Sequence, residues 1–273
     1  MINFIKGILA RARQKRTFKE YGYEIRVFHL QDIGSVSYAQ WLHPFEKPKS
    51  ITLSNVNFYK NIARRGGMII DIGAHTGDTT VPMALAVGRE GRVLAIEPNL
   101  YVFKILKKNA SLNPLYTNII PLCFAATKED GEFIFNYSDA SFCNGGFLSE
   151  IDNQGHHHHY ALKVTGRNLE KYLVENFPDH LEKLELVKID AEGYDKEILT
   201  TIPNILRLYR PKLLIECYRY LNQKERYELF DILEGYGYKV YHLENFDDWG
   251  KRSVIGRENM MDRKHFEMLA LPE

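Results

Sequence analysis

The chain has 273 residues, the length of one α/β domain or of one domain with an extension. Hydrophobic residues make up 45% of it, enough for a sizeable core, and the formal net charge of +1 gives no global field that favours nucleic acid. The cysteines Cys123, Cys143 and Cys217 are widely spaced and odd in number. This argues against a disulfide framework or a zinc site and favours a reducing compartment, which we expect to be the cytoplasm.

The first 19 residues predict a basic amphipathic helix. Its apolar side chains fall on one face, namely Ile5, Ile8, Leu9 and Ala12. Its basic side chains crowd the remaining surface, namely Lys6, Arg11, Arg13, Lys15, Arg16 and Lys19. Such a helix either lies on an anionic membrane or docks on the protein or on a partner subunit. We favour docking, because the apolar stripe is short and lacks tryptophan. A secretory signal or a membrane-spanning helix is not expected.

Residues 1–60 are predicted to form an accessory extension of a main domain, residues 61–273. The apolar pattern predicts two short strands, over 23–30 and 35–41. Residues 54–65 then predict a helix that leads into the first core strand. We expect this accessory layer to cover the active site.

The stretch MIIDIGAHTGDTTVPMALAVG, residues 68–88, predicts a strand, a tight turn and a helix. The apolar run Met68–Ile70 ends in Asp71 and is typical of a buried parallel strand. Residues 79–87 predict a helix. Side chains that can cap its start are present, namely Thr76, Asp78 and Thr79. Strand, glycine turn and helix together indicate a nucleotide-type site.

The spacing within the turn indicates which nucleotide binds. The pattern Asp71-x-Gly73-x-x-x-Gly77 departs from the G-x-G-x-x-G of dinucleotide sites. An acid at the strand end would repel a pyrophosphate but suits the ammonium of an amino-acid moiety, which favours S-adenosylmethionine over NAD. The next strand, residues 93–96, delivers Glu97, whose carboxylate can accept hydrogen bonds from both ribose hydroxyls. The alternative, that both acids only cap strands, is disfavoured because they flank one glycine turn.

The remaining chain alternates strands and helices. Segments with strand patterns are 118–125, 131–138, the start of 161–176, 184–190, 211–218, 238–245 and 265–272. Segments with helix patterns are 102–112, the end of 161–176, 195–201 and 223–238. This order predicts a doubly wound, mostly parallel sheet with an antiparallel last strand. The loop 139–160 contains His156–His159, which we interpret as solvated or as part of a lid, because adjacent histidines make a poor metal site.

A second acidic pair, Asp190 and Glu192, follows the strand that begins at residue 184. Both side chains can point into the cleft from the strand end and its turn. They could contact the methyl site, orient the substrate, act as a general base or bind a divalent ion. In the alternative reading, Asp190 caps the Gly193 turn and Glu192 pairs with Lys188. We favour the functional reading and expect no metal site.

The motifs DIGAHTG, AIEPN and VKIDAEGYDKEIL together resemble the FkbM-type methyltransferases, over roughly Ile69 to Pro272. The ID-x-EG element is the most specific of them. The resemblance implies a seven-stranded, Rossmann-like class I methyltransferase sheet and an O-methyltransferase that uses S-adenosyl-L-methionine. One departure is His75, where the family would have asparagine. An amide there would hold the turn or the methionine carboxylate, and the imidazole would have to take that role.

We therefore expect an S-adenosylmethionine-dependent O-methyltransferase that acts on a hydroxyl of a sugar, glycan or secondary metabolite. The alternatives are an NAD-dependent oxidoreductase and a non-catalytic nucleotide-binding scaffold. The expected catalytic residues are Asp190 and Glu192. The expected cofactor-binding residues are Asp71, Gly73, Ala74, His75, Thr76, Gly77, Glu97, Pro98, Asn99, Ala125, Ala126 and Asp190. Pro98 and Asn99 would shape the adenine slot, and the backbone of Ala125 and Ala126 would read the base.

Overall fold

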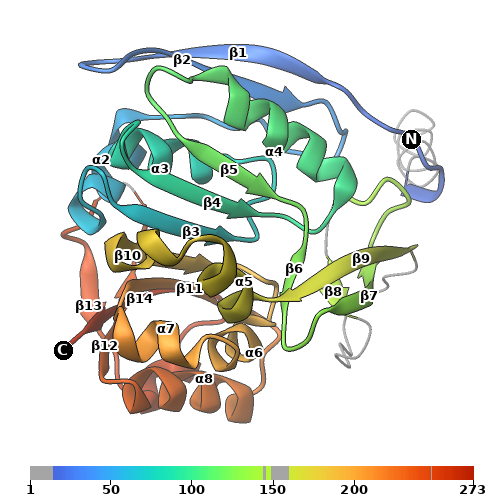
Figure 1. Ribbon diagram of the computed structural model, residues 1–273. Helices are drawn as coiled ribbons and strands as arrows, with labels where there is room; N and C mark the ends of the chain where they lie inside the picture. The colour runs from blue at the N-terminus through green and yellow to red at the C-terminus, as the bar shows by residue number, and fades with distance from the viewer. Residues whose placement is uncertain (1–14, 144–145, 149–159, 247) are drawn as a thin grey trace, which may run out of the picture.

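The computed structural model describes residues 15–143, 146–148, 160–246 and 248–273. Its centre is an eight-stranded sheet of order β13-β12-β14-β11-β10-β3-β4-β5 (Figure 1). In that order the strands are β13 (Arg252–Val254), β12 (Tyr238–Leu243), β14 (Phe266–Pro272), β11 (Lys212–Cys217), β10 (Leu184–Ile189), β3 (Met68–Ile72), β4 (Arg92–Ile96) and β5 (Ile119–Leu122). The strands β11, β10, β3, β4 and β5 pair in parallel, and β14 is antiparallel to both of its neighbours.

The predicted fold class is confirmed, with one difference in strand number. Strand β13 comes from the polar segment between the last two predicted strands and adds an eighth strand at the edge of the sheet. It forms an antiparallel pair with β12 over three residue pairs, from Tyr241 opposite Val254 to Leu243 opposite Arg252. An edge strand this short leaves no long apolar run in the sequence, which is why the pattern did not reveal it.

Helices cover both faces of the sheet (Figure 1). The helices are α2 (Leu53–Ile62), α3 (Thr80–Val87), α4 (Leu100–Leu112), α5 (Leu169–Asn176), α6 (Asp195–Thr200), α7 (Pro203–Leu208) and α8 (Gln223–Gly235), with 3-10 turns η1 (Pro178–Lys183) and η2 (Arg257–Met261). Neighbouring residues of β3 enter different cores. Ile69 packs in the cluster that contains the buried side chains of α2 and α3, whereas Ile70 packs with those of α5 to α8. Both faces are therefore buried, as the continuous apolar run predicted.

The accessory segment begins with an antiparallel hairpin, β1 (Tyr23–Leu30) and β2 (Gly34–Trp41). Asn109 of α4 and Asn113, the residue that follows this helix, bind the backbone of β2. Asn109 accepts a hydrogen bond from the amide of Ala39 (2.6 Å) and donates to its carbonyl (3.1 Å), and Asn113 binds Ser37 in the same way. Helix α2 includes residue 60, the predicted domain boundary. It packs on α3 in a hydrophobic cluster that both helices share. The division of the chain at residue 60 stays a prediction.

Part of the predicted central sheet forms a separate, smaller sheet. The predicted strand 118–125 divides into β5 and β6 (Ala125–Thr127), because the chain leaves the central sheet after Leu122. Strand β6 joins a four-stranded sheet of order β6-β9-β7-β8, with β7 (Gly131–Tyr137), β8 (Phe147–Leu148) and β9 (Tyr160–Asn168). The break turns Ala125 and Ala126 toward the end of the central sheet where the site lies.

Two predictions fall on segments outside the described residues: the helix over residues 1–19, of which only residues 15–19 are described, and the His156–His159 run. Within the described ranges, every helix is too short or too polar to cross a bilayer. All three cysteines are free thiols. A cytoplasmic location stays a prediction.

Candidate active site

A cavity of about 410 Å³ opens at the carboxyl ends of β3, β4 and β10. This is where ligands bind in doubly wound sheets. Most residues predicted for the site line this cavity, namely Gly73, His75, Glu97, Pro98, Asn99, Ala125, Ala126, Asp190 and Glu192. The other predicted residues, Asp71, Ala74, Thr76 and Gly77, are not among its lining residues.

The glycine turn is held against the two neighbouring strand ends. The amides of Gly73 and Ala74 both donate to the carbonyl of Ile96, at 3.1 and 3.0 Å. Gly73 has φ +76°, and a Cβ on it would lie 1.9 Å from the carbonyl oxygen of Asp190. Glycine is required here because the turn passes directly against the end of β10.

Asp71 is not among the residues that line the cavity, and its predicted role with the cofactor stays a prediction. Its side chain is fully buried, and its Oδ2 accepts hydrogen bonds from Thr80 (2.6 Å) and Thr79 (3.2 Å). Its Oδ1 lies 3.4 Å from Nζ of Lys188. Oδ2 is thus held by two threonine hydroxyls beneath the turn, whereas Oδ1 has this ion pair but no hydrogen bond among the described residues. Thr79, one of the three residues predicted to cap α3, makes no side-chain cap hydrogen bond, because its hydroxyl binds Asp71.

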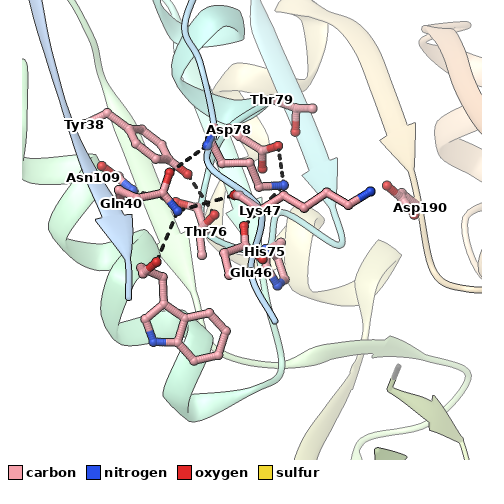
Figure 2. Close-up of polar contacts among 12 residues, drawn as sticks. Tyr38, Gln40, Glu46, Lys47, His75, Thr76, Asp78, Thr79, Asn109 and Asp190 are labelled. Carbon is pink, nitrogen blue, oxygen red and sulfur yellow. Dashed lines mark hydrogen bonds and ion pairs between the residues drawn. The ribbon is translucent and has the colours of Figure 1, made fainter. Parts of the chain in front are cut away.

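Thr76 and Asp78 bind the accessory segment (Figure 2). The hydroxyl groups of Thr76 and Tyr38 are hydrogen-bonded at 2.7 Å, and Asn109 donates to the Thr76 carbonyl at 2.7 Å. Asp78 forms an ion pair with Lys49 at 2.9 Å. Burial would raise the pKa of Asp78, but Lys49 lowers it overall, so this carboxyl is ionised. Segments distant in sequence therefore fix the turn.

Glu97 lies at the end of β4 with both carboxylate oxygens held by backbone. Its Oε2 accepts from the amide of His75 (3.0 Å) and its Oε1 from that of Asn99 (2.8 Å). The side chain of Asn99 also caps α4 by accepting from the amide of Tyr101. Burial raises the pKa of Glu97, and the nearby His75 and the two amides oppose the rise. Each oxygen keeps a lone pair for a second donor.

The loop after β2 places basic side chains beside the cavity. Gln40 fixes this loop by accepting from the amide of Lys49 (2.7 Å) and donating to the carbonyl of Lys47 (3.4 Å). Both lysines line the cavity. Figure 2 shows the Lys47 side chain extending toward Asp190, whereas Lys49 pairs with Asp78. The accessory segment therefore lines the cavity with Lys47 and with Lys49, whose charge is balanced by ion pairs with Glu46 and Asp78.

Asp190 and Glu192 line the cavity from the end of β10 and the turn that follows it. Asp190 has a side chain 40% exposed and pairs with Lys188 at 3.2 Å. Glu192 has φ +51° and a hydrogen bond with Tyr218. Burial, and then the charge of Asp190, raises the pKa of Glu192.

In the alternative reading of this segment, Glu192 pairs with Lys188 and Asp190 caps the turn. The structure assigns both contacts to other residues. Asp190 pairs with Lys188, and the buried Asp195 accepts from the amide of Gly193 at 3.1 Å. Both Asp190 and Glu192 therefore keep their carboxylates beside the cavity.

The family model for the methyltransferase FkbM domain matches residues 71–240, more than half of the chain. The chain belongs to the FkbM methyltransferase family. Solved structures with a similar fold include the FkbM methyltransferase of Methylobacillus flagellatus KT, 13% identical, covering 79% of this chain and 50% of that one at a TM-score of 0.44. Fibrillarin from Methanococcus jannaschii is 14% identical, covering 92% and 84% at a TM-score of 0.45.

Three contributors to this FkbM-family site were missed from the sequence. Lys188 was considered only as a partner of Glu192, yet it is a buried cation between Asp71 and Asp190. Burial alone would lower its pKa, but Asp190 and Asp71 raise it well above the usual value. The sequence did contain a sign of this role, because a lysine is unusual in a buried, mostly apolar strand. Lys47 and Lys49 carried no signal, because only tertiary contacts bring their loop to the cavity.

Proposed function

We propose that the chain is an S-adenosyl-L-methionine-dependent O-methyltransferase whose acceptor is a hydroxyl of a small molecule or glycan. The observation that supports this most is that Glu97 and the Asp190–Glu192 pair stand on different walls of one cavity. Glu97 would accept from the ribose hydroxyls. Pro98 and Asn99 on one side, and Ala125 and Ala126 on the other, would enclose the adenine. When bound, the cofactor supplies a methyl group on a sulfonium.

The cavity walls also fit the amino-acid part of this cofactor. A methionyl moiety carries one ammonium and one carboxylate. The carboxylate of Asp190 and the ammonium of Lys47 face each other across the cavity end near the glycine turn (Figure 2). We infer that Asp190 takes over the ammonium contact first assigned to Asp71, and that Lys47 binds the methionine carboxylate.

Methyl transfer needs mainly positioning, and a neutral hydroxyl acceptor gains further from a base. Glu192 suits the base because its raised pKa makes the ionised carboxylate a stronger proton acceptor. Asp190, beside it and paired with Lys188, would orient the acceptor hydroxyl and the cofactor. An NAD-dependent oxidoreductase would not need this second carboxylate wall.

Calorimetry tests the cofactor. We expect S-adenosylhomocysteine to bind in the micromolar range and NAD not to bind. Glu97→Ala should weaken S-adenosylhomocysteine binding by about 1–3 kcal/mol, because the ribose hydroxyls lose a buried acceptor. Glu90→Ala, at an exposed carboxylate, is the matched control and should leave affinity unchanged. Tight binding of NAD would contradict the proposal, and binding without turnover on any hydroxyl acceptor would favour the non-catalytic scaffold.

A second measurement tests Lys47. Lys47→Gln should weaken S-adenosylhomocysteine by about 1 kcal/mol, near fivefold, as expected for a partly exposed ion pair. It should leave the affinity for 5′-methylthioadenosine unchanged, because that ligand lacks the amino-acid part. Glu97→Ala should weaken both ligands. Equal losses for both ligands in Lys47→Gln would show that Lys47 does not bind the methionine carboxylate.

A further inference from the structure

Beside the methyltransferase cavity, three side chains with metal-binding atoms meet on one face of the central sheet. Glu216 of β11 lies directly opposite Glu267 of β14 in the antiparallel register. His265 lies in the bend just before β14, two residues ahead of Glu267. One atom from each side chain lies within 4.8 Å of the others. None of the three residues lines the cavity.

Two glutamates directly opposite each other on neighbouring strands need a positive charge or a shared proton to offset their repulsion. Like charges directly opposite each other destabilise a sheet. Glu216 is only 8% exposed, and its Oε1 lies 3.4 Å from Nε2 of His265. Its Oε2 is fully enclosed and has no hydrogen-bond partner among the described residues. A buried carboxylate oxygen without a donor is costly, so this atom points to a missing ligand.

We propose that Glu216, Glu267 and His265 bind one divalent transition-metal ion that ties β11 to β14. Mixed oxygen and nitrogen donors suit Zn²⁺ or Mn²⁺ better than Ca²⁺ or Mg²⁺, which prefer oxygen alone. Two ligands at about 2.1 Å from one ion lie at most about 4.2 Å apart, so a small rotation of the half-exposed His265 completes the set. Water would fill the remaining positions. This ion neutralises the carboxylate pair and takes no part in the proposed methyl transfer.

Direct binding to the full, untagged chain tests the site. The protein is stripped with EDTA and titrated with Mn²⁺, and the free ion is followed by electron paramagnetic resonance; Zn²⁺ then competes for the bound Mn²⁺. We expect one saturable equivalent. Glu267→Gln and His265→Gln should each weaken it by about tenfold or more, since each removes one of three ligands.

Matched controls separate this site from other metal-binding groups. His242→Gln changes a histidine of the neighbouring strand that lies opposite Met268, one position out of phase with Glu267. Glu132→Gln changes an exposed carboxylate on β7. Replacing His156–His159 by alanine removes the histidine run. All three should leave the saturable equivalent unchanged.

Thermal unfolding gives a second readout that does not depend on methyl transfer. At a hundredfold excess over its Kd, the ion should raise the Tm of the wild type by about 5–10 °C and that of Glu267→Gln not at all. If Glu216→Gln fails to fold, His265→Gln still tests the metal site. The His265 side chain is 37% exposed, so its replacement should not disturb the core. The proposal would be overturned if binding were not saturable, or if the ligand variants bound the ion as well as the controls do. A proton shared between Glu216 and Glu267 would then offset the repulsion between them.

Discussion

Replacing either Asp190 or Glu192 by its amide is expected to lower the methyl-transfer rate by about 10²- to 10⁴-fold, the usual scale for a lost acid–base group. The amide keeps the shape of the side chain and removes its charge. S-adenosylhomocysteine affinity should change little in Glu192→Gln, because this residue is assigned to the acceptor. In Asp190→Asn it should fall as well, because Asp190 is also assigned to the methionine ammonium.

The pH profile distinguishes a base from a structural role. Burial and Asp190 raise the pKa of Glu192, and a base must be ionised to act. The wild-type rate should therefore rise with pH through this raised pKa, and Glu192→Gln should lack that limb. Glu197→Gln, on the neighbouring helix α6 and paired with Lys196, is the matched control. Wild-type rates in both amide variants would show that the pair is structural.

Lys188→Met should be the most destabilising single change in the site. Lys188 is the only cation within ion-pair distance of Asp71 among the described residues, and its side chain is 5% exposed. Removing one partner of a buried pair costs about 3–5 kcal/mol, because the other charge stays buried without compensation. For a domain of this size the Tm should fall by about 6–20 °C.

Chemical denaturation measures this loss, and two comparisons interpret it. Lys196→Met breaks a more exposed pair with Glu228 and should cost at most about 1 kcal/mol. The double variant Asp71→Asn with Lys188→Met should be more stable than the sum of the two single losses predicts, because it removes the orphaned charge. Simple additivity of the two changes would show that Lys188 does not compensate Asp71.

Features that rest on local chemistry could be predicted from the amino-acid pattern. A glycine turn after an apolar strand, and acids at three strand ends, were enough to predict the fold class and the edge of the sheet that holds the site. Gly73 illustrates why: its positive φ and its approach to Asp190 admit no side chain, so the residue type carries the information. Glu97 and Asp190 likewise follow their strands directly and line the cavity.

The tertiary structure decided which of these acids is available to a ligand. In a parallel strand buried on both faces the apolar run is continuous, so the sequence does not show that Asp71 points beneath the turn toward Lys188. The loop that carries Lys47 reaches the cavity only because α4 and Gln40 hold the accessory hairpin there. Glu216 and Glu267 lie 51 residues apart and face each other only through the register of β11 and β14. Contacts of this kind depend on how distant segments pair, and no local pattern records that pairing.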